Sequence, residues 1–131
     1  MTPRYLTIDD VVFLHNEGIR LYGGAYGVRD RHLLESAVGQ TQQSFGGVPL
    51  YHSLAEIAVV YWSGLVLNHP FIDGNKRVGL RAADVFLKLN GIELVMTSDQ
   101  AVKLTLDLIT RVISRNDLIN AVAEHSQPVV Q

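Results

Sequence analysis

The sequence SLAEIAVVYWSGLVLN, residues 53–68, decides the fold of this chain. Ser53 and Glu56 have the S-x-x-E spacing of a capping box, which predicts that a helix begins at this point. From Ile57 to Asn68 nearly every position is apolar, so the predicted helix has no polar face to turn toward water. A helix of this kind is buried on all sides. We therefore predict that it lies in the middle of a helical bundle.

Further helical patterns lie on both sides of this segment. Thr7 is placed to cap a first helix that ends at a Gly-Gly pair, residues 23–24, and a second helix follows Asp30. Beyond the central segment, another apolar helix over residues 78–89 is stopped by Asn-Gly at residues 90–91.

The last third of the chain is predicted to contain shorter elements. Residues 92–95 form the one extended segment that we expect, Thr97 caps a fifth helix, Asn116 caps a short sixth, and residues 127–131 form a frayed tail. No repeat or linker divides the chain, so we predict a single all-α domain over residues 1–131, a bundle of about six helices. The fifth helix takes its apolar positions from Val102, Leu104, Leu106, Leu108, Ile109 and Val112.

Composition excludes several classes of protein. The 131 residues, 47% of them hydrophobic, suit one domain with a substantial core. Eleven basic and thirteen acidic residues give a formal net charge of −2, which argues against direct binding of nucleic acid. There is no cysteine and no His-Glu-x-x-His pair, so we expect neither disulfides nor a zinc hydrolase. No segment is apolar enough for a signal peptide or a membrane span, so we expect a cytoplasmic protein without a membrane partner.

The chemistry of the chain is concentrated in the nonapeptide HPFIDGNKR, residues 69–77. A histidine can accept a hydroxyl proton at neutral pH, and His69 lies where the central helix gives way to a loop, so it is a candidate general base. Asp73 is the only carboxylate in this stretch. It can hold Mg²⁺, which needs only one or two protein carboxylates when phosphates and waters supply the other ligands.

The second half of the nonapeptide is suited to an anion. Gly74 lets the backbone turn, after which the main-chain amides of Asn75, Lys76 and Arg77 point out of a helix N-terminus, where the dipole favours negative charge. The Arg77 guanidinium can fork onto two phosphate oxygens, Lys76 is a point charge, and the Asn75 side-chain amide is a further donor. Together these groups predict a site for phosphoryl or nucleotidyl transfer.

Each part of the nonapeptide also has a purely structural interpretation. A histidine at a helix end is most often a cap or a core residue, Asp-Gly-Asn is a common turn, and Lys-Arg after a turn is usually a solvated face. The combination of all these parts within nine residues, with Phe71 available to anchor the loop in the core, is what favours a phosphate site.

The nonapeptide closely resembles the signature of the Fic/Doc family, which reads H-P-F-x-D/E-G-N-G-R-x-x-R in its adenylylating members. This resemblance implies the helical Fic/Doc fold. It covers most of the chain and continues in Tyr22-Gly23-Gly24, Gly27-Val28-Arg29-Asp30, Phe86-Leu87 and Asn90-Gly91.

Two departures from that signature make the chain similar to the Doc branch in particular. Lys76 stands where adenylylating members have a second glycine, and Leu80 stands where they have a second arginine. The lysine should crowd the place where that glycine lets an α-phosphate approach the backbone, and the leucine offers no fork for a triphosphate. Arg81, one position further on, either stands in for the missing arginine or contacts phosphate or the target in its own way.

The resemblance to Doc proteins implies a toxin that acts as an ATP-dependent protein kinase. ATP would bind in the reversed sense, and its γ-phosphate would pass to a hydroxyl, with a threonine of elongation factor Tu as the expected target and arrest of translation as the result. His69 would be the base and Asp73 the Mg²⁺ ligand. Two alternatives stay open: a Fic-type adenylyltransferase that transfers AMP, and a catalytically weak module that binds nucleotide or an antitoxin. The expected phosphate and ATP contacts are Gly74, Asn75, Lys76, Arg77 and Arg81.

The segment before the central helix, residues 46–52, has two interpretations. It is either a flexible loop or, by resemblance, the flap with which Fic relatives dock the extended chain of a target through main-chain pairing. The residues that would form such a flap are Gly47, Val48, Pro49 and Leu50.

Control of the protein is expected to come from a partner. Self-inhibiting relatives carry a helix with S/T-x-x-x-E-G/N, whose glutamate pairs with the second arginine of the signature. No serine or threonine of this chain has a glutamate four residues later. We therefore expect inhibition in trans, from a small antitoxin whose amphipathic C-terminal helix fills an apolar groove beside the active site.

Overall fold

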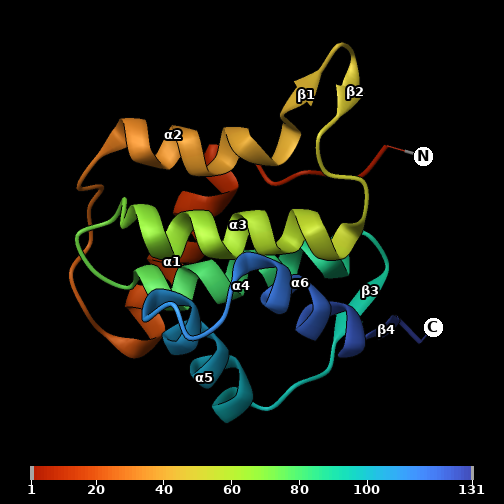
Figure 1. Ribbon diagram of the computed structural model, residues 1–131. Coiled ribbons are helices and arrows are strands. Elements are labelled where there is room, and N and C mark those ends of the chain that lie inside the picture. The colour runs from red at the N-terminus through yellow and green to blue at the C-terminus, as the bar shows by residue number, and fades with distance from the viewer. Residues whose placement is uncertain (1, 131) are drawn as a thin grey trace.

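The structure, a computed structural model, describes residues 2–130 as six α-helices and two small pairs of strands (Figure 1). The predicted all-α bundle is confirmed. No described helix is long and apolar enough to cross a membrane. The helices are α1 (Ile8–Tyr22), α2 (Arg31–Gly39), α3 (Leu54–Asn68), α4 (Asn75–Leu89), α5 (Ser98–Ile109) and α6 (Arg115–Glu124). The strands are β1 (Ser44–Phe45), β2 (Val48–Pro49), β3 (Ile92–Leu94) and β4 (Ser126–Pro128), and a short 3-10 helix, Gln40–Gln42, follows α2.

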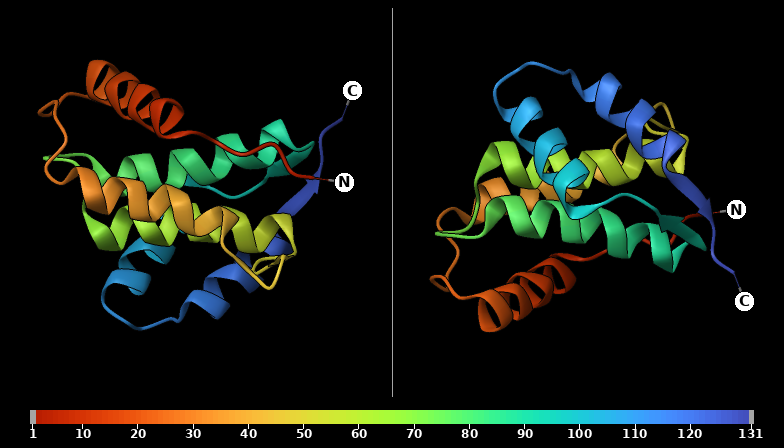
Figure 2. Two further views of the ribbon diagram at one scale, coloured as in Figure 1. Left: turned by 90° about the horizontal axis from the view of Figure 1, so that it is seen from above. Right: turned by 90° about the horizontal axis from the view of Figure 1, so that it is seen from below.

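Helix α3 is the centre of the bundle, as its sequence predicts. It packs against α2, α4, α5 and α6, while α1 lies along α4 (Figures 1 and 2). Every residue from Ile57 to Val66 is buried. The Tyr61 hydroxyl donates to the Leu6 carbonyl (3.0 Å), and the Trp62 indole donates to Thr105 Oγ1 (3.1 Å). These bonds satisfy two buried polar groups and tie α3 to the N-terminal segment and to α5.

Side-chain caps determine where five of the six described α-helices begin. The prediction of Asn116 as the cap of the sixth helix is wrong, and Ser114 caps α6 instead. Its hydroxyl accepts the Asp117 N–H (3.1 Å), and the Asp117 carboxylate accepts the Ser114 N–H (2.9 Å), so the two residues form a reciprocal capping box. The caps that are confirmed are Thr7, Ser53 and Thr97. Asp30, which the second helix was predicted to follow, caps α2.

The C-terminal part of the chain differs from its prediction. The frayed tail predicted over residues 127–131 is wrong for residues 127–128, because β3 offers an edge with which residues 126–128 pair antiparallel. Gln131 lies outside the described residues. The fifth helix is shorter than predicted: α5 ends at Ile109, Arg111 has a positive φ of 62°, and Val112 is exposed beyond the helix.

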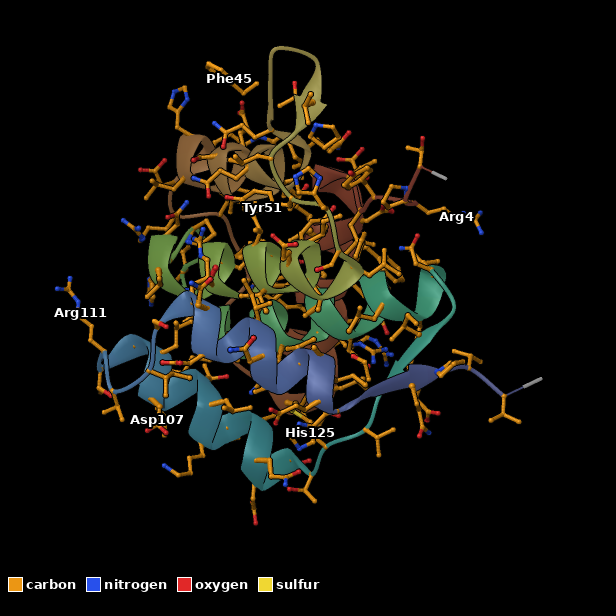
Figure 3. The ribbon with its side chains drawn as sticks, turned by 45° about the vertical axis from the view of Figure 1, so that its right-hand side comes forward. Arg4, Phe45, Tyr51, Asp107, Arg111 and His125 are labelled. Atoms are coloured by element: carbon orange, nitrogen blue, oxygen red, sulfur yellow. The ribbon has the colours of Figure 1, made fainter. Side chains whose placement is uncertain are left out.

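The segment before α3 is a β-hairpin that projects from the body of the molecule (Figure 1). Ser44 pairs with Pro49 and Phe45 pairs with Val48, across a turn at residues 46–47. Phe45 is 86% exposed and points away from the helices (Figure 3). The structure therefore shows a short hairpin here, and its use as a target-docking flap stays a prediction.

Candidate active site

The connection between α3 and α4, residues 69–74, borders an open cleft of about 980 Å³ between the start of α4 and α5. His69 stands at its edge, where it ends α3 in a left-handed conformation (φ 53°, ψ 52°) with an exposed side chain. The structure brings the predicted base, metal ligand and phosphate contacts to this one cleft. Its lining includes His69, Asp73, Gly74, Asn75, Lys76, Arg77 and Arg81.

A buried side chain holds the first half of the loop in shape. Asn75, only 4% exposed, accepts the Phe71 N–H through Oδ1 (2.9 Å) and donates through Nδ2 to the Phe71 carbonyl (3.0 Å). Phe71 itself is buried in the core. The expectation that the Asn75 side-chain amide binds phosphate does not fit this geometry, because the amide is buried and bonded to Phe71. Asn75 stays a candidate phosphate ligand through its main-chain N–H.

His15 of α1 supports the second half of the loop. Its ring stacks on Phe71 with 3.8 Å between the ring centroids, and its Nε2 lies 2.6 Å from the Asp73 carbonyl oxygen. Since a carbonyl only accepts, Nε2 is the donor in this bond. His15 is buried, and its Nδ1 has no hydrogen-bond partner within residues 2–130. No role was predicted for His15, although its spacing from Val11 and Ile19 marks the buried face of α1.

The Asp73 carboxylate is fixed by main-chain donors and faces the cleft. Oδ2 accepts the Ala25 N–H (3.1 Å), and Oδ1 accepts the Gly74 N–H (2.9 Å). These two bonds, helped by the nearby Arg77 cation, hold the pKa of Asp73 below its ordinary value, so the group is ionised at neutral pH. Gly24 makes room for this contact, because a Cβ on that residue would lie 2.6 Å from Oδ2.

A magnesium ion fits this carboxylate when a phosphate is bound beside it. Two of the roughly four lone pairs of the Asp73 carboxylate accept main-chain N–H groups, which leaves the others free for a metal. Within the described residues, no group of three or more His, Cys, Asp and Glu side chains could hold a metal ion. A metal would therefore have one protein ligand and take the others from phosphate and water, as Mg²⁺ commonly does.

The start of α4 differs from the starts of the other described α-helices. Gly74 precedes it in a left-handed conformation (φ 77°) and provides no side-chain cap, whereas α1, α2, α3, α5 and α6 all begin with one. The main-chain N–H groups of Asn75, Lys76 and Arg77 are therefore left without a capping oxygen. N–H groups at this end of a helix dipole favour an anion.

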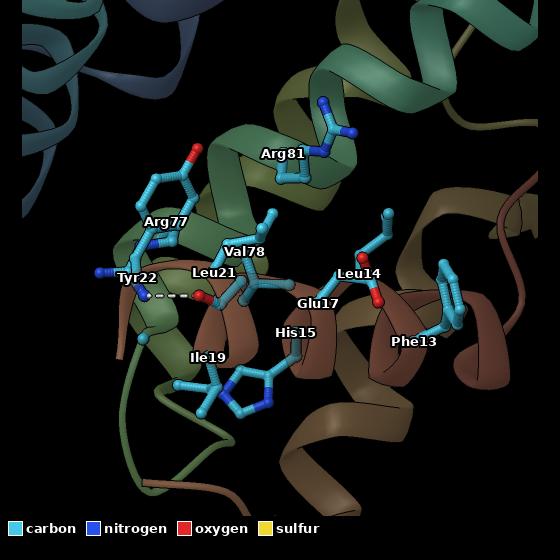
Figure 4. Close-up of a pocket in the computed structure, with 12 residues that line it drawn as sticks. Phe13, Leu14, His15, Glu17, Ile19, Leu21, Tyr22, Arg77, Val78 and Arg81 are labelled. Carbon is cyan, nitrogen blue, oxygen red and sulfur yellow. Dashed lines mark hydrogen bonds between the residues drawn. The ribbon is translucent and has the colours of Figure 1, made fainter. Parts of the chain in front are cut away.

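The Arg77 guanidinium lies beside this helix start. Its Nη1 is 3.4 Å from the carbonyl oxygens of both Gly18 and Gly23, and its Cζ is 5.0 Å from the centre of the Tyr22 ring. Both hydrogen bonds are long, so the guanidinium keeps donors for a phosphate. Arg77 borders the cleft and also a smaller pocket of about 260 Å³ beside α1, where Figure 4 shows it next to Tyr22.

Comparisons with known proteins show the family of this chain. A sequence model of the Fic/DOC family matches residues 5–87. The chain belongs to the Fic/Doc family. It is 35% identical over 119 residues to "Toxin Doc" of Mycolicibacterium smegmatis, and the aligned region covers 91% of this chain and 88% of that protein. It is 31% identical over 111 residues to "Protein kinase doc" of Escherichia phage P1, and the aligned region covers 85% of this chain and 86% of that protein.

A solved Fic structure has the same fold. Fic-1 from C. elegans superimposes with a TM-score of 0.73 over 92% of this Fic/Doc chain, at 18% sequence identity. The matched part spans only 40% of the C. elegans chain. At this identity the similarity shows the fold alone, whereas the two relatives of higher identity are both Doc proteins.

The positions that depart from the adenylylating Fic/Doc signature all lie at the cleft. Lys76 is exposed on its wall, and Leu80 is partly buried one turn further along α4. Arg81 borders both the cleft and the smaller pocket, with its Nη1 3.6 Å from Asp84 Oδ2. Asp84 is a second carboxylate at the cleft, which the sequence analysis did not consider. It is already paired with Arg81 and, at 3.3 Å, with Lys88.

The segment before α2 lies against the active-site loop from the other side. Residues 27–30 run beside residues 70–72, and the Arg29 and Asp30 N–H groups both donate to the Pro70 carbonyl (2.7 and 3.0 Å). From the sequence, this segment contributes only to the family resemblance, because nothing in its local pattern says what it packs against.

The β1–β2 hairpin does not border the cleft. It precedes the N-terminal end of α3, whereas His69 follows the C-terminal end, and the 15 residues of α3 rise about 22 Å (Figure 1). Target docking by Gly47, Val48, Pro49 and Leu50 stays a prediction. A docked segment would need about seven extended residues to reach from the hairpin to His69.

Proposed function

We propose that this Fic/Doc protein is a cytoplasmic, Doc-type toxin that phosphorylates a protein hydroxyl with ATP. One observation carries the proposal: His69 stands at a cleft whose wall is an uncapped helix start with Lys76 in place of the second signature glycine. The names of the relatives, a Doc toxin and a Doc protein kinase, support the same function. A threonine of elongation factor Tu is the proposed target by resemblance, and its phosphorylation would stop translation.

In the proposed reaction, His69 is the general base. The target hydroxyl gives its proton to the imidazole while its oxygen forms a bond to the γ-phosphorus of ATP. The bond from that phosphorus to the β,γ-bridging oxygen breaks, and ADP leaves. Negative charge on the transferred group is stabilised by the N–H groups at the start of α4 and by the Lys76 and Arg77 cations. Asp73 would hold Mg²⁺, which neutralises part of the phosphate charge when bound.

Two labels on ATP test this function. Incubation of the protein with Mg²⁺, elongation factor Tu and ATP labelled on either the γ- or the α-phosphate should transfer the γ label to the target. Transfer of the α label would instead identify an adenylyltransferase. Bound ATP with transfer of neither label would identify a binding module. Mass spectrometry of the target then locates the modified residue and distinguishes a phosphate from an AMP adduct.

Replacing Asp73 by asparagine should weaken Mg²⁺-supported ATP binding and transfer together. The variant loses the negative charge that faces the metal, so we expect the apparent affinity for Mg²⁺ to fall by about 10- to 100-fold or more. A magnesium titration of ATP binding measures this. Asp84→Asn is the matched control, because Asp84 borders the same cleft but is paired with Arg81 and Lys88. An unchanged titration in Asp73→Asn would show that Asp73 only holds the loop.

Replacing Lys76 by glycine tests whether this residue selects the reaction. Glycine restores the close backbone approach of adenylylating relatives, but Leu80 still lacks the arginine fork. We therefore expect phosphorylation to fall by about 100-fold, as for other lost transition-state donors, with a weak gain of AMP transfer. Lys76→Ala removes the same ammonium but keeps the Cβ, so it should lose phosphorylation without that gain. Undiminished phosphorylation by Lys76→Gly would contradict the assignment.

We propose further that a small antitoxin inhibits the protein in trans. Phe13, Leu21 and Tyr22 of α1 are exposed large apolar residues that line the smaller pocket. Figure 4 shows Tyr22 next to Arg77, and Phe13 at the other end of the pocket. An amphipathic C-terminal helix laid on this face would bury them and cover the Arg77 side of the phosphate site.

Expression of the protein alone in a susceptible bacterium should arrest growth, and co-expression of the adjacent small open reading frame should restore it. His69→Ala should not arrest growth. Phe13→Asp should still arrest growth but escape rescue, because it places a charge on the proposed antitoxin face and leaves the cleft unchanged. Colony counts after induction measure both effects. Harmless accumulation of protein that is active in the label assay would argue against a toxin and leave the kinase proposal intact.

A further inference from the structure

An arginine from outside the nonapeptide holds the end of α3. The Arg29 guanidinium donates through Nε to the His69 carbonyl oxygen (2.7 Å) and through Nη2 to the Asn68 carbonyl oxygen (3.1 Å). Both carbonyls lie at the C-terminus of α3, where backbone oxygens have no partner within the helix. The last turn of α3 contains no basic residue of its own. Arg29 therefore supplies the cation that a helix C-terminus favours.

The backbone of His69 explains why this contact matters. Its φ of 53° and ψ of 52° are left-handed, a conformation that is unfavourable for residues with a Cβ. Within residues 2–130, the only other non-glycine residue with positive φ is Arg111. The Asn68 and His69 carbonyls belong to the two peptide planes on either side of the His69 Cα. Because the orientations of these planes are what φ and ψ describe, Arg29 bonds to both groups that set the conformation of His69.

We propose that Arg29 is a positioning residue for the transfer reaction: by holding the two peptide planes that flank His69, it aims the imidazole at the target hydroxyl. This inference rests on the proposed role of His69 as the base. The contacts of Arg29 are with main-chain carbonyls, so its part in the reaction acts through His69. A guanidinium suits this task because its donors lie in one rigid plane, whereas a lysine offers a single point charge.

The backbone around Arg29 is held independently of its side chain. The Arg29 and Asp30 N–H groups bond to the Pro70 carbonyl, and the Ile72 N–H bonds to the Gly27 carbonyl (3.0 Å). Truncation of the side chain thus leaves the pairing of the two segments in place. A merely structural role would lower the stability and the fraction of folded protein but leave kcat per folded molecule unchanged. A positioning role lowers kcat and leaves the KM for ATP unchanged, because ATP binds at the other end of the loop.

Kinetics of Arg29→Ala test this difference. We expect kcat to fall by about 10- to 100-fold, the effect of a small misplacement of a reacting group, while the KM for ATP stays within about twofold. The kcat of Arg29→Lys should lie between that of Arg29→Ala and that of the wild type. Added guanidinium ions should restore part of the activity of Arg29→Ala and none of that of His69→Ala. Arg31→Ala is the control, because Arg31 is an exposed neighbour paired only with Glu35 (3.4 Å) among the described residues, and it should behave as the wild type.

A second measurement is independent of the reaction. In protein with isotope-labelled histidine, the ring signals of His69 are assigned by their loss in His69→Ala. In Arg29→Ala these signals should shift and broaden, whereas those of His125, at the end of α6, should not change. If the wild type transfers neither label from ATP, the proposed function fails, and the His69 signals still decide on Arg29.

Two results would overturn the inference. One is Arg29→Ala with wild-type kcat and unchanged His69 signals. The other is a loss of activity that follows only the folded fraction, as measured by circular dichroism. If Arg29→Ala does not fold, Arg29→Lys is subjected to the same measurements. Wild-type kcat and unchanged His69 signals in Arg29→Lys would then contradict the positioning role of the guanidinium.

Discussion

Replacing His69 by alanine is expected to lower the rate of transfer by about 100- to 10,000-fold, the usual effect of removing a general base. ATP binding should stay close to that of the wild type. The reason is the division of the site between two helices: His69 ends α3, whereas the proposed phosphate contacts belong to the start of α4. The imidazole is exposed at the edge of the cleft and is therefore available to a target hydroxyl rather than to the nucleotide alone.

A second variant separates the base from the backbone at this position. Asparagine tolerates the left-handed conformation of His69 but takes up no proton at neutral pH, so His69→Asn should lose as much activity as His69→Ala. His32→Ala, an exposed histidine on α2, is the control. Transfer of γ label gives the rates, and calorimetry gives ATP affinity. Near-normal turnover by His69→Asn at neutral pH would contradict the base, and a parallel loss of ATP binding would place His69 in the nucleotide site instead.

The fold was predictable wherever a helix is decided by residues close together in the sequence. Ser53 and Glu56 form a capping box over three residues, so the start of α3 depends on no distant part of the chain. The pairing of Glu93 with Gln127 is different, because β4 becomes a strand only through the edge that β3 offers. The sixth helix shows the limit of a single signal. Serine and asparagine both favour the cap position, and the reciprocal contact with Asp117 is what makes Ser114, not Asn116, the cap of α6.

The candidate site also has a part that the sequence predicts and a part that it does not. The chemical groups lie within nine consecutive residues, so the sequence alone was enough to single out His69 and Asp73 as candidates. The groups that hold them come from elsewhere: His15 from α1, the Ala25 N–H from the turn after α1, and Arg29 from the segment before α2. Each acts on a main-chain atom or a carboxylate far along the chain, a contact that leaves no trace in local spacing.

The second large effect that we expect is a loss of stability when Asn75 is replaced. The sequence predicts that the Asn75 side chain binds phosphate, whereas in the structure it bonds to the Phe71 backbone. In Asn75→Ala, the Phe71 N–H and carbonyl both lose their partner in a buried site. An unsatisfied buried polar group costs about 1–3 kcal/mol, so with two such groups the free energy of unfolding should fall by roughly 2–6 kcal/mol. Transfer should fall as well, because the loop that Asn75 shapes carries Asp73.

Denaturant unfolding of Asn75→Ala, with ATP binding measured on the folded protein, decides between the two roles. Asn116→Ala is the matched control: Asn116 is exposed on α6 and is not its cap, so its replacement should change stability by less than about 0.5 kcal/mol. Asn75→Asp keeps an acceptor for the Phe71 N–H but places an oxygen against the Phe71 carbonyl, so it should also be destabilised. Wild-type stability of Asn75→Ala with weakened ATP binding would mean that the amide faces the phosphate, as its place in the nonapeptide suggested. Lower stability, with ATP binding by the folded protein close to that of the wild type, would mean that Asn75 holds the shape of the loop that carries Asp73.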